Sequence, residues 1–141
     1  MIVADVYIRK YNWHVQCYFA VDTYYVKDIL NSLWLNGCNY ETLDEVKDLF
    51  AHDRRNVGLT HSNPDERTSV LVTSITSNPE EFLNSLTHEL CHLTVHMANE
   101  IGIDKNSEEF CYLAGDTARA LYPYCKNLLC ECCRRKLKQN L

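Results

Sequence analysis

The sequence predicts a single α+β domain over residues 1–141, in which a small β-sheet packs against helices. The 141-residue length suits one domain with one hydrophobic core. Runs of β-branched and aromatic residues near the N-terminus and around position 70 are typical of strands. Several other segments repeat apolar residues at three- and four-residue steps, which is the spacing of amphipathic helices.

The first third of the chain is expected to form a hairpin followed by two short helices. The runs IVADVYI and WHVQCYFAV flank KYN, which has the composition of a turn, so the hairpin covers residues 2–21. Asp22 or Thr23 can cap a helix within YYVKDILNSLWLN, and Gly37 stops it. The second short helix lies within ETLDEVKDLFAH.

Two further strands are expected in NVGLTHS and RTSVLVTSIT, separated by the turn NPDE. The second run suits an edge strand or a strand buried on both faces, and the sequence does not decide between them. If it is an exposed edge, the stretch TSVLVTSI could hold an extended substrate by strand addition.

The strongest helical signal covers residues 79–100. Asn78 is a good N-cap, Pro79 suits the first helical position, and Glu81 lies three residues after the cap, as in a capping box. Gly102 is expected to close this helix.

Two more helices are expected after it. One covers residues 107–122, is capped by Asn106 or Ser107, and is interrupted by Pro123. The other is a Cys-rich C-terminal helix over residues 124–138.

Charge and hydropathy narrow the function classes. The net charge is −5 and the only basic block is CCRRKLK, so a dedicated nucleic-acid binder is disfavoured. The N-terminal segment lacks the pattern of a signal peptide, and no run approaches the roughly 20 apolar residues that span a bilayer. We therefore expect a cytoplasmic protein without a membrane partner, whose eight cysteines are thiols or metal ligands.

The segment LTHELCHLTVH contains the pattern H-E-x-x-H as His88, Glu89 and His92. Residues four apart lie on one face of a helix, so the two imidazoles can bind one Zn²⁺. Glu89 projects about 100° further round the helix, where its carboxylate can take a proton from a zinc-bound water. The pattern predicts a catalytic zinc centre.

A catalytic zinc site needs a third protein ligand. His96 lies about 12 Å along the helix axis from His88, too far for one ion to bind both easily. The spacing that other zincins use for a third histidine meets Ala98. A glutamate at the start of the next helix remains, either Glu108 or Glu109, if the two helices pack antiparallel.

The pattern HELCH followed by SEEFCYLAGD resembles the gluzincin metallopeptidases, most closely the small ones associated with phages and mobile elements. The resemblance covers residues 57–122 and implies a zincin-like core and activity on a peptide or protein substrate. In that family the ligand glutamate precedes a tyrosine by four residues. Tyr112 then implies Glu108 as the ligand, with Glu109 as the alternative, and Cys111 stands where the family has a small residue.

Other polar residues near the pattern have open roles. Tyr112 could donate to an oxyanion or simply pack, and Asp116 could orient a ligand imidazole. His96 is expected to support the site or lie on the surface rather than bind the metal. His14 and His61 are expected to be structural or surface residues.

Half of the cysteines lie in the C-terminal segment CKNLLCECC, without the paired C-x-x-C spacing of a zinc knuckle. We expect Cys125 and Cys130 to be buried as small apolar residues, and Cys132 and Cys133 to be exposed and oxidisable. Cys91, between the two histidines, is expected to pack.

These observations together predict a zinc-dependent hydrolase, a peptidase in which Glu89 activates water. The alternative is a non-catalytic zinc-binding protein with a structural or regulatory role, for example a phage-encoded one.

Overall fold

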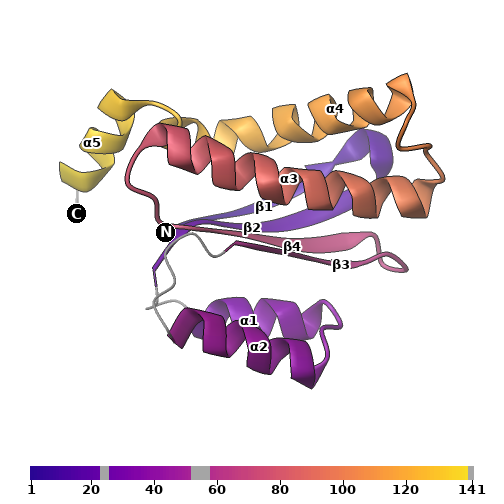
Figure 1. Cartoon of the computed structure of the whole chain (residues 1–141), viewed down its shortest axis with the longest axis horizontal. Helices are drawn as coiled ribbons and strands as arrows, with labels where there is room; N and C mark the ends of the chain where they lie inside the picture. Colours follow the sequence, from indigo (N-terminus) through magenta and orange to yellow (C-terminus); the bar gives the residue numbers. More distant parts are fainter. Residues whose placement is uncertain (23–25, 52–57, 140–141) are drawn as a thin grey trace.

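The computed structural model describes residues 1–22, 26–51 and 58–139. Within these ranges the chain forms a four-stranded sheet in the order β1-β2-β4-β3 and five α-helices. Helices α1 and α2 lie on one side of the sheet, and α3 and α4 lie on the other side (Figure 1). The predicted α+β class is confirmed.

Strands β1 (Ile2–Ile8) and β2 (Trp13–Val21) pair antiparallel, with Ile8 opposite Trp13. The connection is a 3₁₀ turn, η1 (Arg9–Tyr11), which ends at Asn12 in the left-handed conformation at a φ of 50°. Asparagine tolerates this conformation better than most residues. The two strands span the 2–21 range that the sequence indicates.

Strand β4 (Thr68–Ser74) lies inside the sheet, parallel to β2 on one side and antiparallel to β3 (Leu59–Asn63) on the other. Every residue of β4 after Thr68 is buried. This answers the question that the sequence left open. Strand addition at TSVLVTSI is wrong, because both edges of β4 are already hydrogen-bonded; β3 is the edge strand on this side of the sheet.

Helices α1 (Val26–Leu35) and α2 (Tyr40–Ala51) cover the sheet face opposite α3. Gly37 follows α1 at a φ of 84°, which glycine adopts without strain, so the predicted stop is confirmed. The predicted cap at Thr23 lies outside the described residues. The two helices bury an apolar cluster with the sheet that includes Tyr18, Val21, Ile29, Leu33, Val46, Phe50, Val70 and Val72.

Helix α3 (Pro79–Ile101) begins and ends where its capping residues indicate. The Asn78 side chain accepts a hydrogen bond from the Glu81 backbone N–H at 2.8 Å. Gly102 closes the helix in the left-handed conformation, and its N–H donates to the Ala98 carbonyl. The apolar face of α3 packs on the sheet with Phe82, Leu86, Leu93 and Met97 in the main core.

Helix α4 (Glu108–Cys125) is capped by the Ser107 hydroxyl, which accepts from the Phe110 N–H at 3.2 Å. The expectation that Pro123 interrupts the helix is wrong, because α4 continues to Cys125. A proline in the last turn removes only one backbone hydrogen bond, and the helix tolerates that loss. A 3₁₀ turn, η3 (Lys126–Leu128), then separates α4 from α5 (Glu131–Gln139), so the helix expected over 124–138 is divided.

The main core lies between the sheet and helices α3 and α4 and contains the fully buried Trp13, Phe19, Leu93 and Leu113.

No helix in the described ranges combines the length and apolar character that a bilayer crossing needs.

Candidate metal centre

The imidazoles of His88 and His92 lie one above the other on the exposed side of α3. Their Nε2 atoms are 3.3 Å apart. Two nitrogens that each lie about 2.0–2.1 Å from a tetrahedral Zn²⁺ are separated by about 3.3–3.4 Å. The pair therefore has the separation of a chelate, which also suits a single N–H···N hydrogen bond between two neutral rings.

Glu89, the middle residue of the pattern, is buried at 4% exposure. Its Oε2 accepts a hydrogen bond from the Thr60 hydroxyl of β3 at 2.7 Å. Burial of a carboxylate requires such a donor. This residue is therefore not a surface glutamate: it is held between helix α3 and the edge strand β3, directly after His88 in the chain.

Gly58, just before β3, makes room for the Glu89 carboxylate. A Cβ at this position would lie 2.6 Å from Glu89 Oε1 and 3.0 Å from the Val72 carbonyl oxygen. The first distance is shorter than real Cβ–oxygen contacts, and the second is at the tight end of their range. A side chain at position 58 would therefore displace the Glu89 carboxylate from its present position.

His96 is tied to the core by a chain of hydrogen bonds that crosses two strands. The Trp13 indole N–H donates to Ser69 at 2.8 Å, Ser69 and Ser62 hydroxyls are 2.7 Å apart, and Ser62 lies 2.7 Å from His96 Nδ1. An indole nitrogen only donates, so Ser69 is free to donate to Ser62, and Ser62 to His96. This direction gives every hydroxyl proton an acceptor and leaves the imidazole proton on Nε2.

This hydrogen bonding gives His96 a role that differs from that of the histidine pair. Its ring centroid lies 6.4 Å from that of His92. Burial lowers the pKa of His96, and positive charge on His92 or His61 lowers it further. A neutral ring that accepts at Nδ1 can donate from Nε2. Among the described residues His96 forms no three-residue ligand group with His88 and His92, and its supporting role stays a prediction.

Glu108 and Glu109 lie far from the histidine pair. The Thr117 hydroxyl of α4 contacts the Met97 sulfur of α3 at 3.9 Å, and the two helices run antiparallel (Figure 1). Glu108 lies nine residues from this contact towards the α3–α4 connection, and His92 lies five residues in the opposite direction. At 1.5 Å per residue the two are about 20 Å apart along the axes.

No described acid, histidine or cysteine completes a three-residue ligand group with His88 and His92. The arrangement of the helices therefore does not support Glu108 as the third ligand, nor Glu109. Both carboxylates are exposed in the first turn of α4, where the helix dipole favours them.

Two other candidates on α4 are also placed away from the pair. Tyr112 is 63% exposed and lies one turn after Glu108. Asp116 accepts a hydrogen bond from the Tyr11 hydroxyl at 2.8 Å and forms ion pairs with Lys10 and Arg119. These contacts lower the pKa of the Asp116 carboxyl. Because they engage its oxygens, Asp116 does not orient a ligand imidazole.

Cys91 of α3 is exposed, so the expectation that it packs is wrong.

The C-terminal cysteines behave differently from the expectation. Cys125 is buried as expected, but Cys130 is partly exposed, with its sulfur 3.0 Å from that of Cys132. Cys130, Cys132 and Cys133 place three sulfur atoms within 4.8 Å of one another and could hold a metal ion. Hydrogen bonds from the Cys132 thiol and the Cys133 backbone N–H lower the pKa of Cys130 to about 7.

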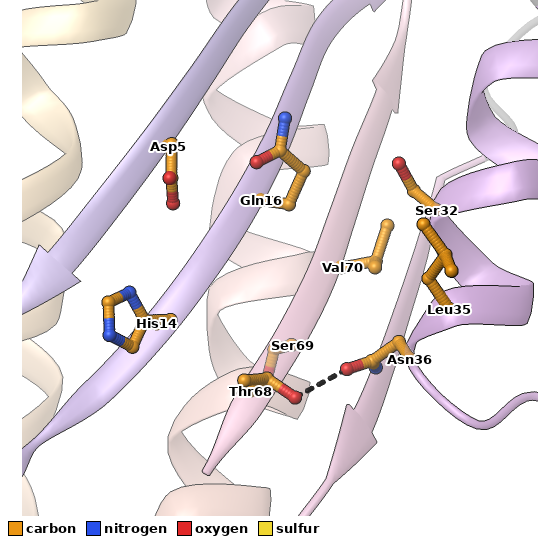
Figure 2. Close-up of a pocket in the computed structure, with 9 residues that line it drawn as sticks. All are labelled: Asp5, His14, Gln16, Ser32, Leu35, Asn36, Thr68, Ser69 and Val70. Carbon is orange, nitrogen blue, oxygen red and sulfur yellow. Dashed lines mark hydrogen bonds between the residues drawn. The ribbon is translucent and has the colours of Figure 1, made fainter. Parts of the chain in front are cut away.

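A polar hollow of about 280 Å³ lies on the sheet face that α1 covers (Figure 2). Its wall includes Asn36, whose oxygen accepts from Thr68 and whose amide donates to His61. His14, also in the wall, stacks on Tyr7 at 4.5 Å. The Asn36 bonds join the residue after α1 to strands β3 and β4, and we assign the hollow no chemistry.

Sequence reasoning missed three residues of the centre, Gly58, Thr60 and Ser62. The signal available was the alternation in LTHSN, which places Thr60 and Ser62 on one face of a strand. Comparison of the chain with models of protein families, with curated proteins and with solved structures finds no match.

Replacement of Thr60 by valine tests the bond that holds Glu89. Thr60→Val keeps the shape but removes the hydroxyl donor from a buried carboxylate, and we expect a loss of about 1–3 kcal/mol in the free energy of unfolding. Thr60→Ser keeps the hydroxyl and is the matched control. Urea unfolding measures both, and equal losses in the two variants would contradict the assigned role.

Acidification is expected to destabilise the fold through His61 and His96, because burial lowers the pKa of both. As the pH falls, these two histidines take up protons at a higher pH in the unfolded chain than in the folded chain. The stability that the neutral rings contribute is therefore present above about pH 6.5 and is lost as the pH falls below it. Unfolding of wild type and His96→Gln at about pH 7.5 and about pH 5.5 measures the effect. The variant should lose less stability on acidification than the control His14→Gln, and an equal loss would contradict the prediction.

Proposed function

We propose that the chain is a zinc-dependent hydrolase, a peptidase of the H-E-x-x-H kind with a zincin-like core, in which His88 and His92 bind Zn²⁺. The 3.3 Å separation of the two Nε2 atoms is the observation that carries the proposal. Two histidines at this separation provide two of the three protein ligands of a catalytic zinc site, and the buried Glu89 provides a carboxylate beside them.

The chain's own residues provide the chemistry around the ion. When bound, Zn²⁺ would polarise the scissile carbonyl and make a water molecule more acidic. Glu89 would accept a proton from the attacking water and return it to the leaving amine. The Thr60 hydroxyl would keep the Glu89 carboxylate oriented, and the Nε2–H of His96 would offer a hydrogen-bond donor one turn beyond His92.

The edge strand suggests how a substrate would lie. Strand β3 is the last strand of the described sheet, and its face carries Thr60 and Ser62 against α3. An extended peptide could add to the outer edge of β3 by backbone hydrogen bonds. Its scissile bond would then run past Glu89 and the histidine pair, which is the proximity that hydrolysis requires.

A non-catalytic zinc protein, with a structural or regulatory role, is the second candidate. It is favoured by the absence of a third ligand group near the pair among the described residues, and by the Thr60 bond that already engages the Glu89 carboxylate. Loss of metal would then unfold the protein rather than stop a reaction.

Zinc content tests the first step of the proposal. The variant Cys130→Ser/Cys132→Ser/Cys133→Ser removes the thiol group, so that its zinc reports the histidine pair alone. We expect near-stoichiometric zinc in this variant by mass spectrometry and at least a tenfold loss when His88→Ala or His92→Ala is added, because one imidazole cannot replace a chelate. His14→Ala is the matched control, and Glu108→Gln should also keep the metal. No zinc in protein prepared without chelators would refute the proposal.

Glu89→Gln separates the two candidate functions. In an enzyme this variant should keep the zinc and lose peptide hydrolysis by about 100-fold or more, because glutamine cannot accept the proton. Cleavage of a mixed peptide library, followed by mass spectrometry, measures it, and Glu45→Gln on α2 is a control. Full cleavage by Glu89→Gln would contradict the assigned role, and no cleavage by any form would favour the non-catalytic candidate.

A further inference from the structure

Three thiols converge where helix α5 begins. Cys130 directly precedes the helix, and Cys132 and Cys133 lie in its first turn. The Cys130 and Cys132 sulfurs are 3.0 Å apart, and those of Cys132 and Cys133 are 4.0 Å apart. Cys132 is exposed and the other two are partly exposed, so an ion in solution can reach all three.

The sulfur–sulfur distances are too long for a disulfide, and they are close to those between thiolates that bind one metal ion. A disulfide would need about 2.05 Å between the sulfurs. Thiolates bound at about 2.3 Å to one ion are about 3.8–4.0 Å apart. The Cys132–Cys133 separation already has this value, and Cys130 reaches it by an outward shift of less than about 1 Å.

We propose that Cys130, Cys132 and Cys133 bind one thiophilic d¹⁰ ion, Zn²⁺ or Cu⁺, as three thiolates. Soft sulfur ligands select these two ions over harder cations. Three sulfurs complete a trigonal site for Cu⁺, whereas Zn²⁺ would take a solvent molecule as its fourth ligand. This site is separate from the histidine pair and does not depend on the proposed hydrolase.

The charges around the cluster favour an anionic complex. On binding, each S–H bond breaks, its proton leaves to solvent, and the sulfur electron pair forms the bond to the ion. Three thiolates give a complex of charge −1 with Zn²⁺ and −2 with Cu⁺. Helix α5 carries one acid, Glu131, which pairs with Arg135 at 3.3 Å, and four cations: Arg134, Arg135, Lys136 and Lys138.

The ion would fix the start of α5 against the rest of the fold. Arg134 is buried and donates to the Thr76 carbonyl, in the segment before α3, and Leu137 packs on the main core. An ion that joins Cys130 to the first turn would hold the helix at the position where these two contacts form.

The test uses the full chain with His88→Ala and His92→Ala, so that metal binding reports the thiols only. Reduced protein is titrated anaerobically with Co²⁺, a spectroscopic stand-in for Zn²⁺, and separately with Cu⁺ against a chromogenic chelator. We expect one equivalent bound, with a thiolate-to-cobalt charge-transfer band that Zn²⁺ displaces, or one Cu⁺ retained against the chelator. The titration that shows binding, with Co²⁺ or with Cu⁺, identifies which of the two ions the site takes.

Each of Cys130→Ser, Cys132→Ser and Cys133→Ser should abolish this binding. Cys91→Ser and Cys111→Ser, at exposed cysteines outside the cluster, should leave it unchanged. Serine is nearly isosteric, and far-ultraviolet circular dichroism checks that every variant keeps its helices. The proposal is overturned if the reduced protein binds neither ion, or if full binding survives any one of the three cluster substitutions.

Discussion

The hydrogen bond from Thr60 to the buried carboxylate of Glu89 joins helix α3 to the edge strand β3, and the candidate centre depends on it. A buried acid without a donor would be unfavourable by several kcal/mol, so this contact fixes the rotation of α3 about its axis. Once Glu89 faces β3, the helical spacing places His88 and His92 together on the solvent side of the same helix. One polar contact thus orients all three residues of the pattern.

The topology of the sheet provides the second constraint. Because β4 pairs with β2 on one side, its other side receives β3 as the outer strand. This order places Thr60 and Ser62 beneath α3, and it lets the chain from Trp13 through Ser69 reach His96. The candidate centre therefore stands on the rigid core, while its histidine pair stays open to solvent.

Local features could be predicted from the sequence, whereas contacts between distant segments could not. The caps at Asn78 and Gly102 depend on neighbouring residues, so the bounds of α3 follow from the sequence. The position of Glu108 depends on how far α3 continues beyond His92, and the nine further residues to Ile101 carry the start of α4 away from the pair. The thiol cluster was missed because one continuous helix was expected where η3 divides the chain.

Anomalous diffraction at the zinc edge from crystals grown without chelators tests the central claim most directly. The account predicts an anomalous peak about 2.0–2.1 Å from the Nε2 atoms of both His88 and His92, on the side of α3 that faces solvent. Well-ordered density for both imidazoles with no anomalous peak between them, in protein that has been supplied with zinc, would contradict it.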